Sequence, residues 1–175
     1  SAYSLEKPEQ SLETHTISVL VDNEPGVLAR VIGLFSGRGY NIESLTVAET
    51  EPEAHLSRIT LVPTGTPVGS EQIKNQLDRL VPIHSVTDLT VRGETLEREL
   101  ALVKVAGIGE KRVEALRLAE AFRAQVVDAS LEHFVFEITG RQTKIEQFVV
   151  LMQPLGLIEV CRTGVAAIGR GVERM

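Results

Sequence analysis

The chain has 175 residues, of which 43% are apolar and 24% are charged, enough to bury a core in one large domain or two small ones. Its 18 basic residues against 24 acidic ones give a net charge of -6, which argues against a protein that binds nucleic acid by neutralising phosphates. The single cysteine, Cys161, excludes an internal disulfide, and no Cys/His cluster with metal-ligand spacing accompanies it. We therefore expect a reducing compartment and no metal site.

The first part of the chain, residues 1–14, is polar and carries three glutamates. It lacks both the apolar core of a signal peptide and the arginines of a transit peptide, so we predict a mobile tail. No apolar run in the chain approaches the ~20 residues that a helix needs to cross a bilayer. We expect a soluble, cytoplasmic protein.

The rest of the chain shows one pattern of elements twice. Alternating apolar residues predict strands, and apolar residues at steps of three and four predict helices. The first set consists of a strand at 15–21, a helix at 25–38, strands at 41–49 and 55–62, a helix capped by Ser70, and a strand at 83–91. The second set consists of a strand at 100–105, a helix at 110–123, strands at 125–129 and 134–139, a helix at 141–153, and a strand at 157–162.

Both sets have the order β-α-β-β-α-β, which is the split ferredoxin-like unit. We therefore predict an α+β protein with two tandem ferredoxin-like sandwiches, at residues 15–92 and 97–175, in which 163–175 form a tail. A sheet covered by helices on one face leaves its other face and its edges available for pairing. We expect the chain to form oligomers.

The segment D-N-E-P-G at residues 22–26 has the properties of a ligand site. It joins a predicted strand to a helix, whose first N-H groups are unpaired and lie at the positive end of the helix dipole, where a carboxylate is stabilised. The amide oxygen of Asn23 could accept from an ammonium group, Gly26 would let a ligand approach the backbone, and Val27 and Leu28 would offer apolar surface. The same residues also make a good turn and helix start, and on local grounds alone that interpretation is favoured.

A longer stretch, from Asp22 to Ala48, contains V-I-G-L-F-S-G-R-G-Y-N-I-E-S-L-T-V at 31–47. It closely resembles the amino-terminal ACT domain of the acetolactate synthase (acetohydroxyacid synthase) small regulatory subunits. The resemblance continues through L-S-R at 56–58, E-R-E-L-A-L-V-K-V at 97–105 and R-T-G-V-A-A-I-G-R-G at 162–171. It covers nearly everything after the tail.

The resemblance implies a regulatory subunit without catalytic residues of its own. Such a subunit forms a homodimer whose paired ACT domains hold a branched-chain amino acid, with valine favoured over leucine and isoleucine. It assembles with a catalytic large subunit, on which it confers activation and feedback inhibition. The resemblance places thiamine diphosphate, Mg²⁺ and FAD on that large subunit, so no cofactor is expected here.

The same resemblance assigns the effector site. It implies contacts from the asparagine and glycine of the strand-to-helix loop and from an asparagine of the partner chain. The matching residues and their neighbours here are Asn23, Glu24, Pro25, Gly26, Val27, Leu28, Asn41 and Ile42. Pro25 departs from relatives that carry serine, and because proline has no N-H it removes one candidate donor to the ligand carboxylate.

Two other functions stay open at this stage. The chain could be a stand-alone ACT sensor that regulates another enzyme. The G-I-G sequence at 107–109, followed by Lys111 and Arg112, could bind a DNA backbone as a helix-hairpin-helix, although the segment before it reads as a strand and the net charge is negative. Catalysis has little support, because the four histidines are dispersed and expected at the surface, and no serine or cysteine has the context of a nucleophile.

Overall fold

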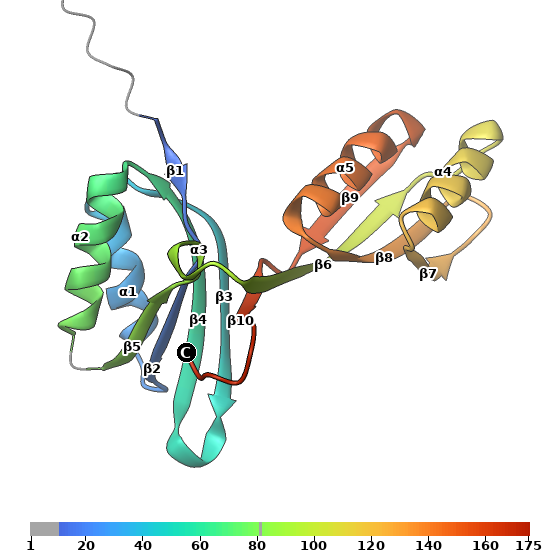
Figure 1. The fold of residues 1–175 in the computed structure, drawn as a ribbon. Coiled ribbons are helices and arrows are strands. Elements are labelled where there is room, and N and C mark those ends of the chain that lie inside the picture. The colour runs from blue at the N-terminus through green and yellow to red at the C-terminus, as the bar shows by residue number, and fades with distance from the viewer. Residues whose placement is uncertain (1–10, 81) are drawn as a thin grey trace, which may run out of the picture. The chain divides into compact units, whose positions relative to one another are not determined.

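The computed structural model describes residues 11–80 and 82–175. Contacts divide the chain into two compact units, the first ending at Gly93 and the second spanning Glu94–Arg174. In each unit, two long helices cover one face of an antiparallel sheet (Figure 1). The predicted α+β fold with two tandem ferredoxin-like sandwiches is confirmed.

The first unit builds its sheet around β4. Its elements are β1 (Glu13–Thr14), β2 (Ile17–Asp22), α1 (Val27–Ser36), β3 (Asn41–Glu51), a 3-10 turn (Pro52–Ala54), β4 (Leu56–Gly65), α2 (Pro67–Asp78), β5 (Ile83–Asp88) and the short helix α3 (Leu89–Arg92). β3 and β2 flank β4 on its two sides, β1 extends the line of β2 along β4, and β5 lies outside β2. All these pairs are antiparallel.

The core of the first unit lies between this sheet and the two helices. The i, i+4, i+8 stripe of α1 turns Val27, Val31 and Phe35 inward, as the apolar spacing predicts for a helix that packs on one side. Alternate residues of the sheet meet them, since successive side chains of a strand point to opposite faces. The buried cluster consists of Ile17, Val19, Val21, Val27, Val31, Phe35, Ile59, Leu61, Ile73 and Leu77.

The second unit repeats the arrangement around β6. Its elements are β6 (Thr95–Val105), α4 (Glu110–Ala121), β7 (Gln125–Ala129), β8 (Phe134–Gly140), α5 (Gln142–Met152), a 3-10 turn (Gln153–Leu155), β9 (Leu157–Arg162) and β10 (Ala166–Gly169). β8 pairs with one side of β6 and with β7, while β9 and β10 share the other side of β6. Phe136 and Phe148 are fully buried in its core and meet edge to face, with ring centroids 5.9 Å apart.

The structure corrects the two predicted tails. Glu13 and Thr14, assigned to the tail at 1–14, form β1 and pair with Gly65 and Thr64; residues 1–10 of that tail lie outside the described residues. The tail at 163–175 contains β10, which pairs with the first residues of β6. Strands of two and four residues are too short to show the alternation on which a sequence prediction depends.

Two predicted element boundaries are also wrong. α2 begins at Pro67 rather than after a cap at Ser70, and proline suits the first helical position because its missing N-H would have no partner there. The strand predicted at 83–91 ends at Asp88. The Asp88 side chain accepts hydrogen bonds from the N-H groups of Thr90 and Val91 and so caps α3.

Tyr40 fixes the chain where α1 gives way to β3. Its ring meets Phe35 edge to face at 6.5 Å between centroids, and its N-H donates to the Phe35 carbonyl. The ring lies directly over Gly65 of β4, in the space that a Cβ at that position would occupy. Gly65 therefore has a packing role, because any larger residue would displace Tyr40 from Phe35.

We predict opposite effects from two alanine substitutions at glycine. Gly65→Ala should destabilise the protein by about 1 to 3 kcal/mol through the clash with Tyr40. Gly33→Ala lies in the exposed middle of α1, where a Cβ meets no other atom within 4 Å, and should stabilise it by about 0.5 to 1 kcal/mol. Urea denaturation of the two variants measures both changes. A Gly65→Ala midpoint equal to that of the unmutated protein would show that the packing of the Tyr40 ring does not depend on Gly65.

Candidate functional site

The loop 22–26 is held to both neighbouring parts of the sheet. The N-H of Asp22 donates to the carbonyl of Pro82 over 2.9 Å, and the N-H of Asn23 donates to the carbonyl of His55 over 2.8 Å. The Asp22 carboxylate also contacts Nε2 of His84 at 2.6 Å. The backbone of the loop is thus positioned by the segment before β4 on one side and by β5 on the other.

The start of α1 is open to a ligand. Gly26 precedes the helix with φ 85° and ψ -10°, and no side chain caps the helix. This left-handed conformation suits glycine, because a Cβ there is strained in most residues. The N-H of Val27 donates to the Glu24 carbonyl at 3.4 Å. The N-H groups of Leu28 and Ala29 also belong to the first turn, where an α-helix offers no intrahelical acceptor. An anion at this position would meet N-H donors and the positive end of the helix dipole.

The predicted loop residues differ in exposure. Asn23, Glu24, Pro25 and Gly26 are exposed, and Leu28 is 37% exposed. Val27 is only 3% exposed and belongs to the core. The expectation that Val27 offers apolar surface to a ligand is therefore wrong, whereas Leu28 does present its side chain.

Asn41 and Ile42 open β3 next to Tyr40. Asn41 is exposed and its amide nitrogen donates to Glu43 at 3.4 Å. Glu43 also accepts from the Thr64 hydroxyl at 3.1 Å. Ile42 is half-buried against the core of the first unit. The Asn41 amide thus lies beside a small polar group made of Glu43 on β3 and Thr64 near the end of β4.

The structure does not bring Asn23 and Asn41 together within one chain. Asp22, which precedes Asn23, pairs with Leu56 at the start of β4. Asn41 pairs with Thr64 near its end. These two positions on β4 lie eight residues apart, which at ~3.3 Å per residue is roughly 25 Å. Asn23 and Asn41 are thus at opposite ends of the same sheet, and one copy cannot enclose a small ligand with both.

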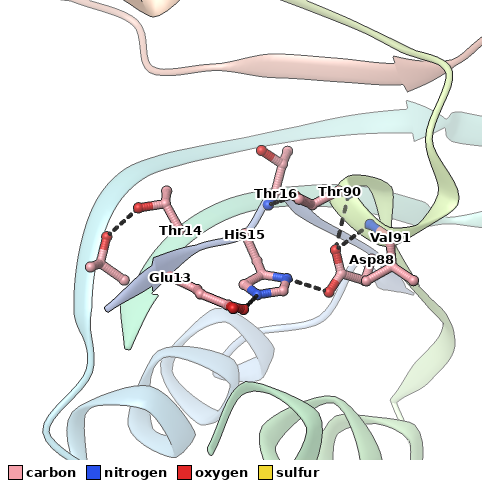
Figure 2. A network of polar contacts seen from close by, with 8 residues as sticks. Glu13, Thr14, His15, Thr16, Asp88, Thr90 and Val91 are labelled. Carbon is pink, nitrogen blue, oxygen red and sulfur yellow. Dashed lines mark hydrogen bonds and ion pairs between the residues drawn. The ribbon is translucent and has the colours of Figure 1, made fainter. Parts of the chain in front are cut away.

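Sequence reasoning missed the partners of two histidines. His84 contacts Asp22 at the candidate loop, and His15, expected at the surface, is only 12% exposed between two carboxylates (Figure 2). Each histidine has a carboxylate partner more than 60 positions away in the sequence. No local pattern signals such a pair, and only the pairing of β2 with β5 brings the partners together.

The glycine loop at 107–109 does not have the helix-hairpin-helix arrangement. Strand β6 precedes it, where that motif requires a helix. Arg112 donates to the Gly107 carbonyl at 3.2 Å and its guanidinium lies 4.0 Å from the centre of the Phe134 ring. The basic side chain of Arg112 therefore contacts other residues of the second unit.

No group of three or more His, Cys, Asp or Glu side chains in the described part of the chain could hold a metal ion. No helix among the described residues is long and apolar enough to span a bilayer.

Two family models cover most of the chain. The model described as the AHAS small subunit-like ACT domain matches residues 17–85. The model described as the small subunit of acetolactate synthase matches residues 98–171. The match to the first model includes the loop 22–26 and Asn41.

Individual proteins agree with these models along almost the full length. The probable acetolactate synthase small subunit of Archaeoglobus fulgidus is 47% identical over 90% of this chain and 97% of its own. The acetolactate synthase small subunit of Haemophilus influenzae is 42% identical over 89% and 94% of the two chains. The crystal structure of the acetolactate synthase small subunit from Thermotoga maritima superposes with a TM-score of 0.81 at 38% identity, covering 92% of this chain and 99% of that one. The chain therefore belongs to the family of acetolactate synthase small subunits.

Proposed function

We propose that this chain is the regulatory subunit of an acetolactate synthase, and that it reports the level of a branched-chain amino acid to a catalytic large subunit. Its family is that of the small subunits, so the chemistry belongs to the partner. The observation that carries the effector site is the exposed, uncapped start of α1 at Gly26. The functional unit is a homodimer in which each pocket takes residues from both chains.

The chemistry of the site suits an α-amino acid. The ligand carboxylate would accept from the N-H groups at the start of α1. Because Pro25 has no N-H, this contact depends on Gly26 and the first turn of the helix. The ammonium group would donate to the amide oxygen of Asn23, with the exposed carboxylate of Glu24 nearby. Leu28 would contact the aliphatic side chain of the ligand.

The separation of Asn23 and Asn41 supports a pocket between two copies. In a twofold dimer, any contact between the Asn23 end of one copy and the Asn41 end of the other occurs twice. Each contact would place the amide of Asn41 and the side chain of Ile42 over the helix start of the partner. Two equivalent pockets would result, each completed only on dimerisation.

The pocket can distinguish the three branched-chain amino acids only modestly. One methylene in an apolar pocket changes the binding free energy by about 1 to 3 kcal/mol. We favour valine, the smallest of the three, as the main effector. A coupling free energy of about 1 to 3 kcal/mol between effector and catalytic subunit would change activity several-fold to about a hundredfold.

The proposal is tested by reconstitution. Mixing this chain with the large subunit of its acetolactate synthase should raise the activity of the large subunit, and valine should then reduce it. Calorimetry with valine, leucine and isoleucine on the isolated chain measures effector binding separately. No heat from any of the three would contradict the sensor role, and activation without binding would leave only an assembly role.

A pair of substitutions at Gly26 separates charge from shape. Asparagine and aspartate have the same shape and both tolerate a positive φ, but aspartate places a negative charge beside the ligand carboxylate. We expect Gly26→Asp to abolish effector binding and feedback inhibition, and Gly26→Asn to weaken them less. Circular dichroism should show both variants folded. Equal affinities of the two variants would show that the carboxylate does not dock at this helix start.

Mixed dimers test the shared pocket. Asn23→Ala and Asn41→Ala should each remove effector binding from a homodimer. A heterodimer of the two variants, purified through two different tags, should regain one intact pocket of its two, because its unmutated Asn23 and Asn41 lie on different chains. If each pocket used both asparagines of one chain, the heterodimer would bind no better than either variant homodimer.

A further inference from the structure

His15 lies between two carboxylates in the first unit (Figure 2). Its Nδ1 is 2.7 Å from Oδ2 of Asp88, and its Nε2 is 3.1 Å from Oε2 of Glu13. The side chains of His15 and Asp88 are each 12% exposed, whereas that of Glu13 is 49% exposed. Both ring nitrogens therefore have an acidic partner, and one of these partners is largely removed from water.

This geometry requires a specific protonation state. An ionised carboxylate can only accept hydrogen bonds, and a neutral imidazole has one N-H donor and one lone pair. Only the imidazolium ion can donate to Glu13 and Asp88 together. Burial lowers the pKa of His15, but the hydrogen bonds to Glu13 and Asp88 outweigh this effect and raise the pKa above its ordinary value of 6.5.

Other charges also face this position. A cavity of about 560 Å³ adjoins the ring and is lined by charged residues from β1, α2 and α3. These are Glu13 on β1, Glu71 and Lys74 on α2, and Arg92 on α3. The cations oppose the imidazolium and Glu71 favours it, while the carboxylates in contact with the ring act at the shortest distances.

The group holds the beginning and the end of the first unit together. Oδ1 of Asp88 accepts from the N-H groups of Thr90 at 3.0 Å and Val91 at 3.4 Å. The N-H of Thr16 donates to the Thr90 hydroxyl at 2.8 Å. Asp88 thus joins His15 through one oxygen and caps α3 through the other. Through these bonds His15 connects β1 to α3, the last element before the chain leaves the unit at Gly93.

His133 in the second unit provides a contrast. Its Nε2 contacts Asp128 at 2.8 Å, and its Nδ1 contacts the Ser130 hydroxyl at 2.7 Å. A hydroxyl can donate or accept, so this arrangement is satisfied by either the neutral or the charged ring. The two ring contacts of His15, with Glu13 and Asp88, include no such partner. Loss of a proton therefore removes one hydrogen bond from His15, whereas His133 can keep both of its hydrogen bonds.

We propose that His15 is a proton-dependent latch that holds β1 and α3 in place as an imidazolium and weakens both when its proton is lost. Since the folded state binds this proton more tightly than the unfolded chain, the stabilisation is complete below about pH 6.5, the ordinary value for histidine. It decreases as the pH rises through the higher pKa of the folded protein. The helix α3, at the end of the first unit, is then held less firmly in alkaline than in mildly acidic solution.

Nuclear magnetic resonance of the wild-type protein tests the protonation state. The ring nitrogens of His15 should both carry protons at about pH 6, and the titration midpoint of the ring should lie above 6.5. A ring with only one protonated nitrogen at about pH 6 would overturn the proposal, because His15 could then not donate to both Glu13 and Asp88. This measurement does not depend on any variant.

Amide hydrogen exchange tests the latch itself. Protection of the Thr16, Thr90 and Val91 amides, corrected for the intrinsic effect of pH, should fall about threefold to tenfold between about pH 6 and pH 9. His15→Gln should make this protection low and independent of pH. His133→Gln is the matched control and should leave the pH profile of these amides unchanged. A flat profile in the wild type, or an unchanged profile in His15→Gln, would refute the latch.

Discussion

The register of β4 determines where every candidate residue of the first unit lies. β4 is flanked by β2 and β3, and both pairings are antiparallel, so β2 and β3 run in the same direction. One of them leads into the loop 22–26, and the other begins with Asn41. A shift of one residue would also turn the buried side chains Ile59 and Leu61 to the opposite face. The core therefore fixes the register, and the register puts the two asparagines at opposite ends of the sheet.

This constraint is the physical basis of the dimer proposed above. In a single copy, the start of α1 lies at one end of the sheet and the Asn41 amide lies at the other end. The amide of one copy therefore cannot cover the helix start of the same copy. Neither half alone can surround a ligand of a few ångströms. In the proposed dimer, ligand binding and association would favour each other, because a ligand that contacts both chains would stabilise the dimer over the separate copies.

Sequence patterns predicted the helices and strands in which apolar residues recur at a regular spacing. The helices α1, α2, α4 and α5 and the longer strands carry apolar residues at a recurrent spacing, and their order was predicted correctly in both units. β1 and β10 are too short for a pattern, and α3 depends on one cap from Asp88. The environments of His15 and Val27 follow from tertiary contacts. His15 contacts a carboxylate 73 positions away in the sequence. Val27 is the first residue of α1 to face the core. The apolar spacing of the helix indicated this burial, but the prediction of a ligand site did not take it into account.

The two ends of the second unit emerge side by side. Thr95, where β6 begins, pairs with Gly169, where β10 ends, and Glu94 accepts a further backbone hydrogen bond from Arg170. A unit with adjacent entry and exit points can be inserted into a surface loop of another protein without stretching the host chain. The segment 94–170 therefore has the geometry of a cassette that could be exchanged between homologous chains as one piece.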